Sequence, residues 1–197
     1  MKGKIPKWVI WVIILILLGL IFWAAKDFKE KQIQKQKDAY IQYHNNFRFE
    51  RRQGMWVTKW AKDGVEYTIP FRFLPRDVVN ITVEGELEGF KLDRLYIAHN
   101  PDDVNLTYVS LAGTELSLSL GTVFDINGSA ACTKEEPGVC PPRPIVSCGE
   151  EDGSVILFEV TETPEIILNG TCITIRGNGF DLVRAVDNLL YQLYGII

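Results

Sequence analysis

Histidine is scarce in this sequence, with 2 residues among 197. The sequence also has no HExxH zinc motif, no Walker loop, no GxGxxG loop and no nucleophile elbow. Because histidine serves so often in acid/base chemistry and in metal binding, these absences argue against the commonest enzyme classes. We therefore predict no catalytic residue, no metal site and no cofactor, and we expect a protein that is not an enzyme.

Acidic residues are few in the first part of the chain and basic residues are few in the rest. Residues 1–62 contain 13 Lys and Arg against 4 Asp and Glu, whereas residues 63–197 contain 8 against 21. A basic leader thus precedes an acidic body. An acidic body repels phosphate backbones, so we expect no nucleic-acid partner.

The run WVIWVIILILLGLIFWAA at Trp8–Ala25 has no charged residue. Eighteen helical residues, helped by their flanks, can cross a hydrocarbon core of about 30 Å, and Trp8, Trp11 and Trp23 lie near its ends, as interfacial indoles do. Secretory cleavage sites need small residues, but Trp23 stands two positions before Ala25. We predict an uncleaved transmembrane signal anchor with a cytoplasmic tip at 1–25.

Two features of the sequence give opposite predictions for the side of the membrane on which the body lies. Three lysines precede the run and five follow it at 26–37, which by the positive-inside rule would keep the body in the cytoplasm. The body nevertheless contains four Asn-x-Ser/Thr glycosylation sequons, whereas composition alone predicts about one. Their asparagines are Asn80, Asn105, Asn127 and Asn169. Asn-Gly at two of them is also ordinary turn chemistry.

Cysteine is absent before Cys132, and all four cysteines lie in the body at Cys132, Cys140, Cys148 and Cys172. Their spacing lacks the close Cys-x-x-Cys pairs that structural zinc sites use. An even number in a short window is typical of disulfides in an oxidising compartment. Three pairings are possible, and we favour Cys132–Cys140 with Cys148–Cys172. Together with the sequons, the cysteines place the body outside the cytoplasm.

Between the apolar run and the body, residues 26–47 favour a helical stalk, because 26–45 has neither Gly nor Pro. Ile33, Gln36, Tyr40, Tyr43 and Phe47 follow a short heptad-like spacing. The stalk is expected to act as a solvated spacer. Self-association along it and contact of its lysines with anionic lipid are alternatives.

Residues 48–197 predict an extracytoplasmic α+β domain built on an antiparallel sheet, with a C-terminal amphipathic helix. Asp102 or Asp103 is a candidate cap for a helix through Ala112, although Leu116–Leu120 alternates like a strand. The C-terminal helix is expected at Phe180–Tyr194. Strands are expected at Met55–Trp60, Val65–Phe73, Val78–Glu84, Leu92–Ala98, Ser154–Val160, Glu165–Leu168 and Thr171–Arg176.

The segment His99-Asn-Pro-Asp102-Asp103 is the best candidate for chemistry, since a histidine beside carboxylates can act as a general base or bind a metal. Turn formation and helix capping explain the same residues more simply. A surface hydrolase that uses His99 with Asp102 or Asp103 is therefore an alternative function. Asp125–Ser129 is similar to part of a calcium loop, but its glycine comes two positions early and the distant glutamate is missing.

The run TCITIRGNGFDLVRAVDNLLYQLYGII at 171–197, with YIAHNPDD at 96–103 and the spaced cysteines, resembles uncharacterised single-pass membrane-anchored proteins of small-genome archaea. That resemblance covers most of the body after Phe71. It implies an N-terminal anchor and a disulfide-bearing outer domain, and it transfers no catalytic residue. Lys2-Gly3 before the apolar run is similar to the processing site of type IV pilins, but Lys4 departs from their pattern and the run lacks their glutamate.

The sequence thus predicts a single-pass, membrane-anchored glycoprotein whose body serves binding, assembly or envelope structure. Its expected partners are the membrane and either another copy of the chain or another envelope protein. A pilin-like filament subunit is the alternative.

Overall fold

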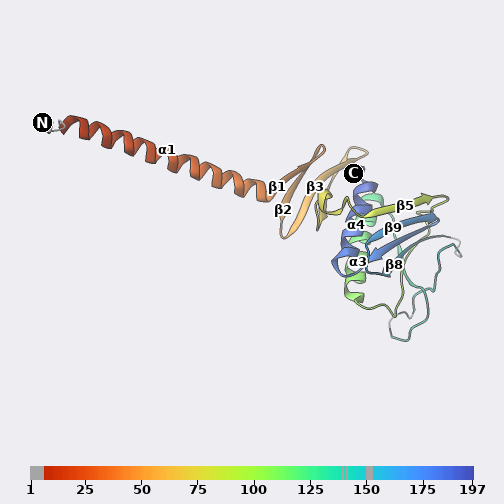
Figure 1. The fold of residues 1–197 in the computed structure, drawn as a ribbon. Coiled ribbons are helices and arrows are strands. Elements are labelled where there is room, and N and C mark those ends of the chain that lie inside the picture. The colour runs from red at the N-terminus through yellow and green to blue at the C-terminus, as the bar shows by residue number, and fades with distance from the viewer. Residues whose placement is uncertain (1–6, 139, 141, 150–152) are drawn as a thin grey trace. The chain divides into compact units, whose positions relative to one another are not determined.

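The computed structural model describes residues 7–138, 140, 142–149 and 153–197, without the side chains of 7–15, 18 and 35–39. The chain divides into two compact units, Met1–Gln42 and Tyr43–Ile197. Each unit is considered by itself below. Figure 1 shows the order of their helices and strands.

The first unit consists mainly of one 34-residue helix, α1, at Lys7–Tyr40 (Figure 1). The predicted stalk to residue 47 is too long, because β1 begins at Ile41. Tyr43 and Phe47 lie in strands, so the heptad-like seam does not continue through them. Within the described part of the chain, no helix reaches the length and apolar character needed to cross a membrane.

Four strands form an antiparallel meander at the start of the body. In sheet order they are β1 (Ile41–His44), β2 (Phe47–Arg52), β3 (Met55–Lys62) and β4 (Val65–Phe71). A tight turn joins β3 to β4, where Asp63 and Gly64 have φ of 52° and 79°. Positive φ at both central residues matches the right-handed twist of the strands, which explains the Asp-Gly pair.

A six-stranded sheet follows in the rest of the body, together with three helices described below. Its strands are β5 (Thr82–Leu87), β6 (Leu95–His99), β7 (Ser129–Cys132), β8 (Ser154–Val160), β9 (Glu165–Gly170) and β10 (Cys172–Gly177), in the order β5-β9-β10-β8-β6-β7. The predicted antiparallel sheet needs correction here. Only β9 and β10 pair antiparallel, as a hairpin of the two strands expected at the C-terminal end of the sheet, whereas β5–β9, β8–β10, β6–β8 and β6–β7 are parallel. The domain is therefore a mixed α/β fold with one antiparallel and one mixed sheet.

Two further corrections concern helices. Proline at the first helical position starts the short helix α2 at Pro75–Val78, so β5 begins at Thr82 and not at Val78. Helix α3 occupies Leu106–Phe124, including the alternating Leu116–Leu120 stretch, and returns the chain from β6 to its parallel neighbour β7. Its cap is Asn105, at φ 62°, and not Asp102 or Asp103.

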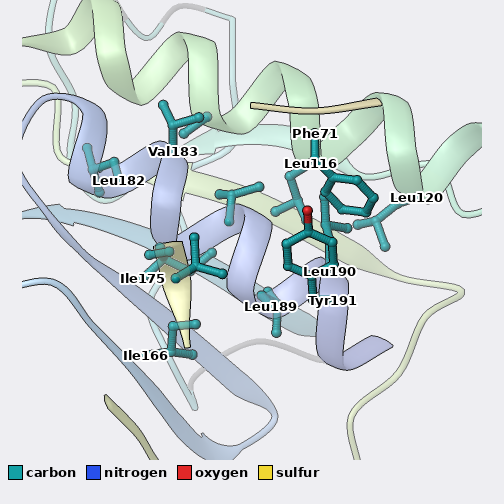
Figure 2. Packing of buried hydrophobic residues seen from close by; sticks show 14 of the residues in the cluster. Phe71, Leu116, Leu120, Ile166, Ile175, Leu182, Val183, Leu189, Leu190 and Tyr191 are labelled. Carbon is teal, nitrogen blue, oxygen red and sulfur yellow. The ribbon is translucent and has the colours of Figure 1, made fainter. Parts of the chain in front are cut away.

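Helix α4 at Phe180–Leu193 is the predicted C-terminal helix, and its apolar stripe enters the main core. Figure 2 shows Leu182, Val183, Leu189, Leu190 and Tyr191 of α4 together with residues of α3, β9, β10 and β4. The side chains of β8, β9 and β10 that face the helices are Ile156, Phe158, Ile166, Ile173 and Ile175. A smaller cluster of Ala98, Ala131, Val146, Val155 and Cys172 packs on the opposite face.

Polar side chains of α4 form hydrogen bonds with the backbone of residues 72–78, which connect the two sheets. Asp187, 2% exposed, accepts the backbone N–H groups of Arg72 and Phe73 at 3.0 and 2.9 Å. Asn188 donates to the carbonyl of Val78 at 2.8 Å, and the Tyr191 hydroxyl donates to that of Phe73 at 2.6 Å. These bonds satisfy backbone groups that burial would otherwise leave unpaired.

Candidate functional site

The four cysteines form two disulfides, Cys132–Cys140 and Cys148–Cys172, which is the pairing that we favour from the sequence. Cys132 ends β7 and is fully buried. Its N–H donates to Pro144 O at 3.0 Å and its carbonyl accepts from Val146 N at 2.9 Å. The segment 142–146, called the proline-rich segment below, therefore runs beside β7. The cysteines therefore hold this segment against the sheet.

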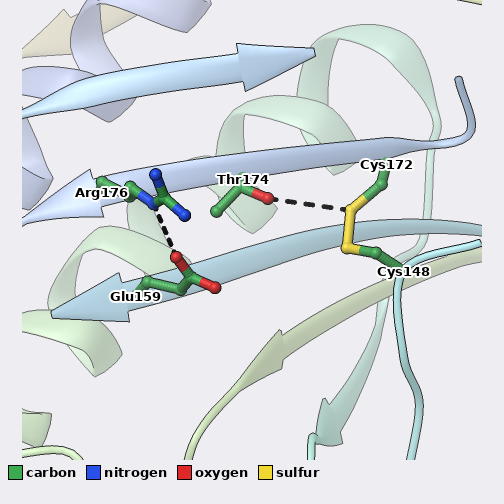
Figure 3. Close-up of a disulfide and its surroundings, with 5 residues drawn as sticks. All are labelled: Cys148, Glu159, Cys172, Thr174 and Arg176. Atoms are coloured by element: carbon green, nitrogen blue, oxygen red, sulfur yellow. Dashed lines mark hydrogen bonds and ion pairs between the residues drawn. A yellow bond between two sulfur atoms is a disulfide. The ribbon is translucent and has the colours of Figure 1, made fainter. Parts of the chain in front are cut away.

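The second disulfide lies on the sheet face opposite α3 and α4. Cys172 begins β10, and Figure 3 shows its sulfur beside Thr174, at 4.0 Å from the Thr174 hydroxyl. Further along the same face, Arg176 Nε donates to Glu159 at 2.6 Å and its Nη1 donates to Glu165 at 2.8 Å. One guanidinium thus links β8, β10 and β9 by cross-strand charge pairs.

All four sequon asparagines are exposed. Asn80 follows α2, Asn127 lies between α3 and β7, and Asn169 lies in β9. Asn105 donates through Nδ2 to Asn178 Oδ1 at 2.8 Å, so the nitrogen that a glycan would modify is hydrogen-bonded in this structure. Exposure meets the steric requirement for glycosylation at each position.

The structure does not join His99 to the carboxylates beside it in sequence. Asp102 pairs with Lys134, which lies in the loop between Cys132 and Cys140. Asp103 accepts from Asn100 Nδ2 at 3.1 Å and from Val160 N at 3.3 Å. Within the described part of the chain, no hydrogen bond links the His99 ring to either carboxylate, so a histidine–aspartate catalytic pair is not formed.

His99 instead borders a groove of about 390 Å³. The ring is half-buried, and burial lowers its pKa, the positive charge of Arg143 lowers it further, and Asp103 partly opposes both effects. Arg143 reaches the groove from the proline-rich segment, 44 positions from His99 in the chain. Sequence reasoning missed Arg143, because only the pairing of the proline-rich segment with β7 brings this residue to the groove.

One wall of the groove is α3 and the other is the edge of the six-stranded sheet. Gly113 and Ser117 line it from α3, and Ile97, Gly128 and Ala130 line it from β6, β7 and the residues before β7. The Ser117 hydroxyl donates to Gly113 O at 2.7 Å, and Thr114 donates in the same way to Ser110 O. The surface of the groove is therefore largely apolar, with its basic groups at His99 and Arg143.

Among the described residues, no group of three or more His, Cys, Asp or Glu is placed so that it could hold a metal ion. The calcium-like stretch Asp125–Ser129 links α3 to β7, and Asp125 is the C-cap of α3 with φ 56°. A helix-terminating role accounts for that residue.

Comparison with family models, with curated proteins and with solved structures finds no match for this chain. The resemblances to archaeal anchored proteins and to pilins thus stay predictions from the sequence. Function must be inferred from the features described above.

Proposed function

We propose that this chain is a single-pass membrane protein whose disulfide-bearing domain lies outside the cytoplasm and serves binding, assembly or envelope structure. The observation that carries the proposal is the pair of disulfides, which persist in oxidising compartments and are rare in the cytosol. Four exposed sequon asparagines support the same compartment.

The proposed anchor is the apolar run within α1. Its large described side chains are apolar and are open to their surroundings on successive turns, with Phe22 75% and Trp23 69% exposed. In water such a surface is unfavourable, and in lipid it is the expected one. Self-association through α1 and contact with another envelope protein are further roles that this proposal includes.

Peptide mapping without reduction, on protein extracted from native membranes, tests the compartment. Arg143 precedes Pro144, so trypsin leaves 135–176 as one peptide with three cysteines. The digest therefore needs a protease that cuts after Glu, with fragmentation between Cys140 and Cys148. Linked Cys132–Cys140 and Cys148–Cys172, with added mass at a sequon, is the expected result.

Four free thiols and unmodified asparagines would place the body in the cytoplasm and overturn the proposal. Thr107→Ala is the matched control for glycosylation. It removes the sequon at Asn105 but keeps the Asn105–Asn178 hydrogen bond, so loss of added mass reports on the sequon alone.

A pilin-like filament subunit is the second candidate. The 34-residue helix followed directly by a β-rich body favours it. It requires removal of the first residues during maturation. Mass spectrometry of the mature N-terminus decides, because an intact Met1 contradicts processing.

A further inference from the structure

The groove beside His99 lies where open α/β sheets commonly bind ligands. His99 is the last residue of β6, and α3 begins a few residues later at Leu106. Ligands of such folds bind outside the carboxyl ends of parallel strands. Here β6, β7 and β8 run parallel, so the His99 end of the groove lies at their carboxyl ends, while Gly128 lines the groove from just before the start of β7.

The carboxylates nearest in sequence offset the positive charge at this end of the groove only in part, because Asp103 still acts on the His99 ring. Asp102 is paired with Lys134, and Asp103 accepts two N–H groups. Arg143 is exposed and makes no ion pair with any residue in the described ranges. Arg143 and His99 both line the groove, so the two basic side chains face the same space.

The remainder of the groove offers mainly apolar contact. Ile97, Val109 and Phe158 line it, and Gly113 and Ala130 add little bulk to its walls, whereas Ile97 fills the space beside Gly128. Its volume of about 390 Å³ lies within the range of small-molecule pockets. A ligand that fits both parts has one anionic end and an apolar body.

We propose that this groove binds a small molecule with a single carboxylate and an apolar chain. The carboxylate accepts from the Arg143 guanidinium, whose planar fork matches it, and from a ring N–H of His99. The apolar chain lies between α3 and the β6–β7 edge. A phosphate group is a poorer fit, because the described lining of the groove supplies only one guanidinium and one imidazole for its larger charge.

This inference deepens the binding role proposed above but does not depend on the anchor or on the compartment. Failure of ligand binding would leave the disulfide mapping unchanged, and a cytoplasmic body would leave the groove unchanged. The two proposals therefore fail separately.

Hexanoate, hexanamide and inorganic phosphate are suitable probes, titrated into the full chain in lipid nanodiscs while the His99 ring signals are followed by NMR. Nanodiscs without protein correct for partitioning of the probes into lipid. We expect saturable, millimolar or tighter hexanoate binding. Hexanamide, with the same chain but no charge, should bind about tenfold more weakly, since hydrogen bonds to a charged acceptor are stronger than those to a neutral one.

Two variants locate the site. Arg143→Gln should weaken hexanoate binding about tenfold and leave hexanamide unchanged, whereas Arg51→Gln, an exposed arginine of β2, is the matched control. Ala130→Leu, at an exposed position of β7, fills the groove and should weaken both probes. Equal affinity for hexanoate and hexanamide, phosphate binding as tight as hexanoate, or no effect of Arg143→Gln overturns the proposal.

Discussion

Asp187 is a carboxyl group with almost no access to water, placed on α4 where it faces the backbone of Arg72 and Phe73. Burial raises its pKa well above the ordinary 3.8 of aspartate, and the nearby charge of Glu115 adds to this, while the N–H groups of Phe73 and Arg72 oppose it. The residue thus combines a costly burial with two hydrogen bonds that the connection after β4 requires.

Replacing Asp187 separates these two effects. Asp187→Leu leaves two buried N–H groups without an acceptor, so we expect the free energy of unfolding to fall by about 2–5 kcal/mol. Asp187→Asn keeps an acceptor oxygen and should cost much less. Urea unfolding followed by circular dichroism measures both, and equal losses for Leu and Asn would contradict this role.

The pH dependence of Asp187 has a defined sign. A carboxyl whose pKa is raised on folding favours the folded state at low pH, and this contribution is lost as the pH rises from 3.8 through the folded pKa. Asparagine does not titrate. Unfolding measured at several pH values should therefore show Asp187→Asn gaining stability relative to the natural protein as the pH rises.

His99 provides a second titration at the residue scale. Its pKa should lie below the ordinary 6.5, Arg143→Gln should raise it, and Asp103→Asn should lower it. The stability that a neutral His99 confers is complete above pH 6.5 and is lost as the pH falls toward the folded pKa. NMR titration measures the pKa of His99, and the variant His44→Gln assigns the signals of the only other histidine. A His99 pKa that Arg143→Gln leaves unchanged would contradict the effect of the Arg143 charge.

At the scale of elements, the two disulfides close loops of different length, with sequence separations of 8 and 24. Chain-entropy arguments give about 2.5 kcal/mol for the shorter loop and about 3.5 kcal/mol for the longer. Replacing Cys148 and Cys172 together by Ala should therefore destabilise the domain by about 1 kcal/mol more than replacing Cys132 and Cys140. Guanidinium unfolding of the two double variants tests the order, and a reversed order would show that contacts of the buried Cys132 outweigh loop length.

Local patterns predict some of these elements well and others poorly. The apolar stripe of α4, the Asp63-Gly64 turn and the β9–β10 hairpin each follow from short-range spacing, and the structure contains all three. The parallel pairs do not follow from strand patterns, because α3 and the segment between β7 and β8 determine how the chain returns. Helix-favouring composition continues past Tyr40, yet pairing with β2 makes 41–44 a strand.

The candidate site shows the same limit of prediction from local sequence patterns. His99 is visible in the sequence as a lone histidine near carboxylates, but its neighbour in the groove is Arg143, not Asp102. A contact across 44 positions depends on how the Cys132–Cys140 loop folds back beside β7. No local spacing carries that information.

At the scale of the whole molecule, the apolar side chains are divided between two different environments. The main buried cluster runs from Phe49 to Ile196, all within the second unit. The described apolar side chains of α1 are exposed, including Leu20 at 56% and Ile21 at 64%. If α1 is an anchor, its removal should leave a domain that needs no lipid.

Residues 43–197 alone should therefore fold, form both disulfides and remain in the aqueous phase of a detergent phase separation, whereas the full chain should enter the detergent phase. The full chain with Ile16→Asp and Leu17→Asp, at the middle of the apolar run, is the control, because each charge near the centre of a span costs about 2.5–3.5 kcal/mol on insertion scales. This variant should shift toward the aqueous phase. A natural full chain that stays in the aqueous phase contradicts the anchor. A domain 43–197 that enters the detergent phase would instead show that the body itself binds membranes. The exposed apolar residues Val79, Val104 and Leu118 would then be the first candidates for that binding.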